Sequence, residues 1–268
     1  KPAPIQITYL GYPNTTGTDT MDYRLTDKHA DPEGVTDQWY TEKLIRLPHA
    51  FLCYAPPQEA PHVNAAPCLE SQETWFGSFN NLAKVTSEVI RLWSKVLSAV
   101  PDSRLLLKNN SLADESTREK IYKQFAQNGV KREHIELLGQ TPSLLEHLRT
   151  YHRVDIALDT YPYNGTTTTF EALWMGIPVI TRFSELHAGR VGYSIMKQLG
   201  LSELTAETDD DFIRITQSLA NNRSRIAQLR TSLRERLNNS TLCNAAGFTH
   251  DIESVYRQLW NQKHSNTG

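Results

Sequence analysis

A chain of 268 residues is long enough for one large domain or two ordinary ones, and 39% hydrophobic with 22% charged residues is the composition of a globular protein. A formal net charge of −2 offers no basic face for nucleic acid, and no apolar run approaches the ~20 residues that span a membrane. Three widely spaced cysteines without a CxxC pair argue against a disulfide scaffold and a metal site, and they favour a reducing, cytoplasmic location.

The first 70 residues contain few apolar segments. Residues 5–11 (IQITYLG) and 21–27 (MDYRLTD) are predicted as short strands. Residues 29–51 are expected to form a polar loop and a short helix that ends before Pro48, and the proline-rich stretch after them is typical of a linker. These elements bury too little for independent stability, so residues 1–70 are interpreted as the end of a larger unit with a linker.

From Thr74 onward, strand and helix patterns alternate. Strands are predicted at 74–80, 103–109, 134–139, 154–160 and 177–182, and helices at 87–101, 114–129, 143–153 and 167–176. This β-α alternation predicts a parallel sheet covered by helices on both faces, which is a doubly wound α/β domain over about 71–245. The rest is expected to be mostly helical, with a last amphipathic helix in 246–268.

In an open parallel sheet, ligands bind outside the carboxyl ends of the strands. Four stretches follow predicted strands at that edge: GSFNNLAK, KNN, GQT and DTYPYNGTTTT. We therefore expect any ligand site to be assembled from these segments.

The most informative of these stretches is Gly165 followed by the four threonines 166–169 at the start of a helix. Helix N-termini bind phosphate through unpaired backbone N–H groups and the positive end of the helix dipole, and threonine hydroxyls add small donors. The alternative is a plain N-cap with additional threonine packing. The stretch matches neither GxxxxGK[ST] nor GxGxxG, so P-loop ATPases and dinucleotide dehydrogenases lose support.

Two charged residues accompany this helix start. Glu171 is placed to accept hydrogen bonds from ribose hydroxyls, although a solvated glutamate is the alternative. Lys84 follows the first strand of the domain, where a cation could neutralise a leaving diphosphate, although most lysines are merely solvated.

The motifs FGSFNNLAK, EHLRTYHRVDIALDTYPYNGTTTTFEALWMGIPVIT and HAGRVG, together with PAPIQITYLGYPNTTGTDTMDYRLTD near the start, resemble glycosyltransferase family 41. That family contains the protein O-linked N-acetylglucosamine transferases and the plant SPINDLY-type proteins. The resemblance implies a GT-B fold, with the end of its N-terminal half in residues 1–70 and the donor-binding, Rossmann-like half in 71–245. It also implies a C-terminal helix, 246–268, that packs back across the halves.

The resemblance further implies an inverting transfer of N-acetylglucosamine from UDP-GlcNAc to Ser or Thr hydroxyls of proteins, without a metal or another cofactor. Lys84 corresponds to the lysine that stabilises the leaving diphosphate. His147 and Glu171 correspond to nucleoside-binding residues. The implied diphosphate-binding residues are Gly165, Thr166, Thr167 and Thr168.

Some positions depart from the animal enzymes of the family. Thr166 replaces a histidine, Glu171 an aspartate, Thr150 an arginine and Leu144 a lysine. GTTTT followed by Glu, and PNTTG near the start, resemble the SPINDLY-type branch, whose plant members transfer fucose from GDP-fucose. UDP-GlcNAc and GDP-fucose therefore both stay open as donors.

The family places tetratricopeptide repeats, which hold the acceptor protein, and the first part of the N-terminal catalytic half upstream of these motifs. Neither is found in this sequence, so the chain is expected to be a C-terminal fragment with weak or no transfer activity by itself. A non-catalytic nucleotide-sugar-binding scaffold is the alternative from a different functional class.

Overall fold

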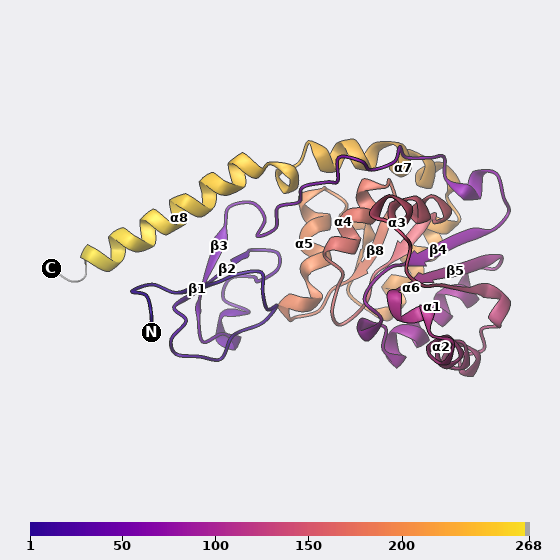
Figure 1. Ribbon diagram of the computed structural model, residues 1–268, viewed down its shortest axis with the longest axis horizontal. Helices are drawn as coiled ribbons and strands as arrows, with labels where there is room; N and C mark the ends of the chain where they lie inside the picture. The colour runs from indigo at the N-terminus through magenta and orange to yellow at the C-terminus, as the bar shows by residue number, and fades with distance from the viewer. Residues whose placement is uncertain (266–268) are drawn as a thin grey trace.

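The computed structural model describes residues 1–265 and contains two parallel sheets (Figure 1). The smaller sheet has the strand order β1-β2-β3, formed by β1 (Ile7–Thr8), β2 (Tyr23–Asp27) and β3 (Lys43–Leu47). The prediction of a helix within residues 29–51 is wrong, because this segment forms a 3-10 turn at Asp37–Trp39 and then β3. Hydrogen bonding to β2 decides the structure of KLIRL, and a local pattern cannot reveal that partner.

The larger sheet has the order β6-β5-β4-β7-β8-β9, and all neighbouring strands are parallel. Its strands are β4 (Thr74–Ser78), β5 (Ser103–Lys108), β6 (Ile135–Leu138), β7 (Ile156–Leu158), β8 (Val179–Arg182) and β9 (Thr205–Ala206). The first five confirm the predicted strands, whereas the two-residue β9 was not predicted. The strand order reverses between β4 and β7, and the carboxyl ends of these two strands mark the point where doubly wound sheets bind ligands.

Helices cover both faces of the larger sheet, with α1, α2 and α6 on one face and α3, α4 and α7 on the other (Figure 1). The helices are α1 (Ser87–Ala99), α2 (Glu115–Gln127), α3 (Leu144–Thr150), α4 (Thr167–Trp174), α5 (Val191–Gln198), α6 (Asp209–Ala220), α7 (Arg223–Asn238) and α8 (Ala245–Ser265). The doubly wound α/β prediction is therefore confirmed. The predicted helix 143–153 is divided, because α3 ends at Thr150 and a 3-10 turn, Tyr151–Arg153, follows it.

The helix starts have local causes in the sequence. The side chains of Thr86, Asp114 and Ser143 each accept a hydrogen bond from a first-turn N–H group, which caps α1, α2 and α3 respectively. Helix α1 then buries an apolar stripe that includes Trp93, whose side chain is fully buried.

The buried hydrophobic side chains form one continuous cluster that includes Phe51 and Leu52 as well as the core of the larger sheet. Helix α8 leaves this body and runs over the smaller sheet, where its Phe248 ring lies 6.3 Å from that of Tyr9 (Figure 1). No helix within residues 1–265 is long and apolar enough to cross a lipid bilayer.

Candidate functional site: a crevice where the strand order reverses

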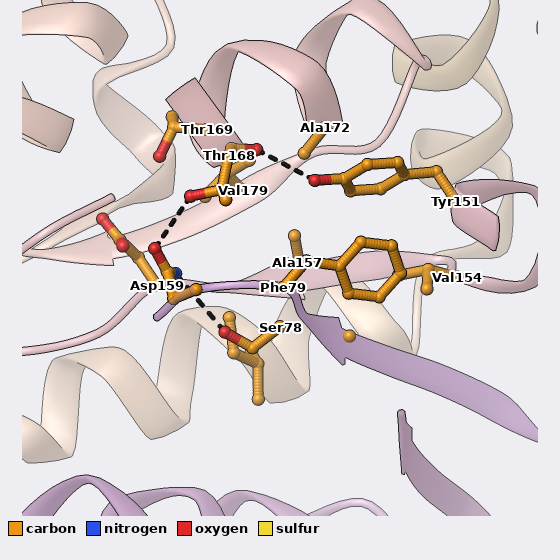
Figure 2. A pocket seen from close by; sticks show the side chains of 13 residues that line it. Ser78, Phe79, Tyr151, Val154, Ala157, Asp159, Thr168, Thr169, Ala172 and Val179 are labelled. Atoms are coloured by element: carbon orange, nitrogen blue, oxygen red, sulfur yellow. Dashed lines mark hydrogen bonds between the residues drawn. The ribbon is translucent and has the colours of Figure 1, made fainter. Parts of the chain in front are cut away.

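A small pocket lies between the ends of β4 and β7, under the start of α4 (Figure 2). Ser78 at the end of β4 and Asn80 just after it border the pocket, as does Asp159 directly after β7. Thr168 and Thr169 border it from α4. The segments that assemble here are therefore two of the four expected from strand ends, GSFNNLAK and DTYPYNGTTTT.

Buried Asp159 holds the turn that leads into α4. Its Oδ1 accepts hydrogen bonds from the N–H groups of Gly165 at 2.7 Å and Thr160 at 2.8 Å, and its Oδ2 accepts one from Thr181 Oγ1 at 2.8 Å. Burial raises the pKa of Asp159 to about 6, although these donors and Lys84 oppose the shift. Asp159 had not been identified from the sequence, where an acid after a strand is a common loop residue.

Position 165 requires glycine because other groups approach its Cα closely. A Cβ there would lie 2.7 Å from Asn80 Oδ1 and 2.7 Å from Thr168 Oγ1. These two atoms are themselves joined by a 2.8 Å hydrogen bond from the Thr168 hydroxyl. Any larger residue would disturb the contact between the β4 end and the α4 start.

The four threonines have different environments. Thr166 occupies the N-cap but its side chain makes no capping hydrogen bond, so the plain N-cap interpretation is wrong for this residue. Thr167 is exposed, Thr168 donates to Asn80, and Thr169 is buried, as the packing alternative expected. Within residues 1–265, the first backbone amides of α4 consequently have no side-chain acceptor and are available to an anion.

Lys84 lies against the loop that precedes α4. Its Nζ donates to the backbone carbonyl of Asn164 at 2.8 Å and lies 3.7 Å from the centre of the Tyr163 ring. Burial lowers the pKa of Lys84, and the charge of Asp159 opposes this shift. The structure thus brings Lys84, from the 3-10 turn Leu82–Lys84 after β4, to the threonine-rich helix start, as the sequence indicates.

His147 and Glu171 also lie side by side, although 24 positions separate them. Nε2 of His147 is 3.0 Å from Oε2 of Glu171, and Nδ1 of the same ring is 2.8 Å from Nζ of Lys108. Lys108 is the last residue of β5. The sequence marked the stretch KNN as a strand end but did not single out this lysine.

Aromatic rings line the same side of the crevice. The Tyr151 and Phe79 rings are 4.3 Å apart (Figure 2). The His147 ring lies 5.7 Å from Tyr151. The Tyr151 hydroxyl reaches the carbonyl of Thr168 at 3.3 Å and Oε2 of Glu171 at 3.4 Å. Burial raises the pKa of Tyr151, so its hydroxyl stays a donor at neutral pH.

The two other positions that depart from the animal enzymes lie on α3. The Thr150 hydroxyl is satisfied within its own helix, where it donates to the carbonyl of Glu146 at 2.9 Å. Leu144 opens the helix and is exposed. Neither side chain provides the cation that the animal enzymes have at these positions.

A six-stranded parallel sheet whose order reverses beside the start of α4 is the doubly wound architecture that binds ligands at the point of reversal. Its match to solved glycosyltransferase structures makes it a GT-B-type fold. The sequence model of glycosyl transferase family 41 matches residues 1–75 and 65–252. The chain belongs to this family.

Known proteins similar to this chain carry related names. The probable UDP-N-acetylglucosamine–peptide N-acetylglucosaminyltransferase SPINDLY of Solanum lycopersicum is 45% identical over 97% of the chain, and the probable enzyme of the same class named SEC, of Arabidopsis thaliana, is 32% identical over 97%. The solved structure of a mutant O-GlcNAc transferase from Thermobaculum terrenum superimposes on the whole chain with a TM-score of 0.93 and 38% identity. The chain spans only 28% of the tomato protein, 27% of SEC and 50% of the solved bacterial chain.

Proposed function

We propose that this chain is the donor-binding part of an enzyme that transfers N-acetylglucosamine from UDP-GlcNAc to Ser or Thr hydroxyls of proteins. The family membership and the names of the similar proteins support the reaction class. The observation that carries the proposal is the convergence of Lys84 with the uncapped start of α4 where the strand order reverses.

In this proposal, the diphosphate of the donor binds at the start of α4. The amides there and the hydroxyls of Thr167 and Thr168 donate to phosphate oxygens, and the helix dipole favours their charge. Gly165 lets the backbone approach closely, and Thr166 borders the same anion from the N-cap position. The acceptor oxygen forms a bond to the anomeric carbon, with inversion, while the bond from that carbon to the diphosphate breaks. The nucleoside diphosphate leaves with the electron pair, and the hydroxyl proton passes to solvent.

Lys84 is the proposed catalytic residue. Its ammonium has donors left beyond the one that binds the Asn164 carbonyl, and these can neutralise the charge that develops on the departing diphosphate. Lys84 and the α4 amides together supply the positive charge that such a leaving group needs, so we propose transfer without a metal ion. Undiminished activity in EDTA is the expected result.

His147 and Glu171 are proposed to hold the nucleoside. The histidine ring offers a face for the base next to the Phe79 and Tyr151 rings, and the Glu171 carboxylate is an acceptor for ribose hydroxyls. The contact between the two side chains supports a single subsite.

We further propose that the acceptor protein is held by other parts of the full-length protein, such as tetratricopeptide repeats and the first part of the N-terminal catalytic half. The similar proteins are about two to three and a half times as long as this chain, which is consistent with such additional parts.

A second candidate donor is GDP-fucose. The threonine at position 166 and the GTTTT run followed by Glu171, which resemble the SPINDLY-type branch, favour it. Calorimetry of this chain with UDP-GlcNAc and with GDP-fucose distinguishes the two by which nucleotide-sugar binds more tightly.

Transfer is tested with the full-length protein, a Ser/Thr peptide mixture and each donor in turn. Mass increments corresponding to N-acetylhexosamine on peptide support the first proposal, and deoxyhexose increments support the second. Donor binding without any transfer or donor hydrolysis would instead establish a non-catalytic scaffold.

A further inference from the structure

A buried lysine lies behind the proposed nucleoside subsite. The side chain of Lys108 is only 5% exposed, and within residues 1–265 its ammonium makes one hydrogen bond, the 2.8 Å contact with Nδ1 of His147. Burial lowers the pKa of Lys108, and the charge of Glu171 opposes this shift. Burying the ammonium of Lys108 costs folding free energy. A methionine or leucine would avoid that cost, so we expect a function that only a cation at this position can serve.

The three side chains determine where the protons of His147 lie. A carboxylate oxygen accepts hydrogen bonds, so the 3.0 Å contact between Nε2 of His147 and Oε2 of Glu171 assigns a hydrogen to Nε2. In a neutral ring Nδ1 is then an acceptor, which matches the ammonium of Lys108 at 2.8 Å. A proton on Nδ1 would instead point at a cation.

Glu171 is the last residue in the series of hydrogen bonds that runs from Lys108 through His147. Both His147 and the Tyr151 hydroxyl contact Oε2, whereas Oε1 has no donor within residues 1–265. Glu171 is therefore held by one oxygen and presents the other as a free acceptor.

We infer that Lys108 is a positioning residue for the nucleoside, because it holds His147 in the Nε2–H tautomer and so keeps Glu171 oriented and open toward the ribose hydroxyls. This inference rests on the proposed function for the identity of the ligand. Lys108 itself acts through His147.

Without Lys108, the ring is free to take a second proton on Nδ1 in mildly acidic solution. The imidazolium then binds the Glu171 carboxylate more strongly and competes with the ribose hydroxyls for it. The titratable groups that face the ring are Lys108 from β5, Glu171 from α4 and Tyr151 from the turn after α3.

The test measures binding of UDP and of GDP to this 268-residue chain by calorimetry from about pH 5.5 to about pH 8, the range in which histidine changes charge. We expect Lys108→Met to bind the preferred nucleotide about tenfold more weakly at neutral pH, with a further loss toward acidic pH that the unaltered chain does not show. Lys108→Arg keeps a donor and should restore the pH profile. Lys123→Met, at an exposed lysine on α2, is the matched control.

Equal affinity and an equal pH profile for Lys108→Met and the unaltered chain would overturn the inference while leaving the proposed function intact. If the unaltered chain binds neither nucleotide, the proposed donor site fails, and the nucleoside role of Lys108 fails with it. Circular dichroism checks that Lys108→Met is folded.

Nitrogen-15 NMR of the histidine rings tests the tautomer without a ligand, with His147 assigned by its absence in His147→Gln. The inference expects a proton on Nε2 alone in the unaltered chain, whereas in Lys108→Met the ring should also gain a proton on Nδ1 as the pH is lowered. A proton on Nδ1 in the unaltered chain would disprove it.

Discussion

Nδ1 of His187 lies 2.7 Å from Oδ2 of Asp31, and both side chains are almost completely buried. Asp31 follows β2 of the smaller sheet, and His187 belongs to the HAGRVG motif after β8 of the larger one. Arg190 adds a second link, because its Nε donates to the carbonyl of His29 at 2.8 Å. The HAGRVG motif thus joins the two sheets, a role that its sequence did not disclose.

His187→Ala should destabilise the chain by roughly 2–4 kcal/mol, because it leaves a buried carboxylate short of one partner. Burial alone would raise the pKa of Asp31, but the hydrogen bond and charge of His187 keep it below the ordinary value of 3.8. The stability that Asp31 contributes is therefore present above about pH 4 and disappears as the pH falls through its folded pKa.

Thermal unfolding of His187→Ala at neutral and acidic pH measures this contribution. The difference from the unaltered chain should be largest at neutral pH and shrink below about pH 4. His250→Ala, on the exposed face of α8, serves as the control. A melting temperature equal to that of the control would refute the link between the sheets.

Lys84→Ala in the full-length protein should lower turnover by about 100-fold or more, since one group that stabilises developing charge has this effect in other enzymes. Donor affinity should change only a few fold, because the α4 amides still bind the diphosphate. Steady-state kinetics and calorimetry separate the two effects, with exposed Lys95→Ala as the control. Unchanged turnover would remove Lys84 from the mechanism.

Thr167→Val and Thr168→Val should differ in stability although both weaken donor binding. Thr167 is exposed, so its replacement should leave the melting temperature unchanged. Thr168→Val loses the hydrogen bond to the buried Asn80 side chain and should cost about 1 kcal/mol. Calorimetry and thermal unfolding of the pair test the assignment, and full donor affinity in both variants would argue against diphosphate binding by these hydroxyls.

Asp159→Asn should reduce the pH dependence of stability. Burial raises the pKa of Asp159 from 3.8 to about 6, so the folded state binds more protons than the unfolded state between these values. Stability therefore falls as pH rises from about 4 to about 6, by about 3 kcal/mol for this group, and stays level above. Asparagine keeps an acceptor for the Gly165 N–H and carries no charge.

Urea unfolding of Asp159→Asn across that pH range should show a smaller decline than in the unaltered chain. An equal decline in both would show that Asp159 is not responsible for it. Because the variant also removes the negative charge near Lys84, its activity is compared separately.

The sequence by itself determined the α/β architecture, because strand-like and helix-like spacings of apolar residues alternate along the chain. The helix-capping residues are local signals too: Thr86, Asp114 and Ser143. It also indicated Lys84 and the threonine run, since every parallel strand delivers the residues after its carboxyl end to the same edge of the sheet. The tertiary structure alone decided the rest. Strand β3 depends on its hydrogen bonds to β2, and the four threonines differ only by what surrounds each. Lys108 meets His147 across 39 positions of the chain. These relationships depend on contacts between residues far apart in the chain, which local patterns do not encode.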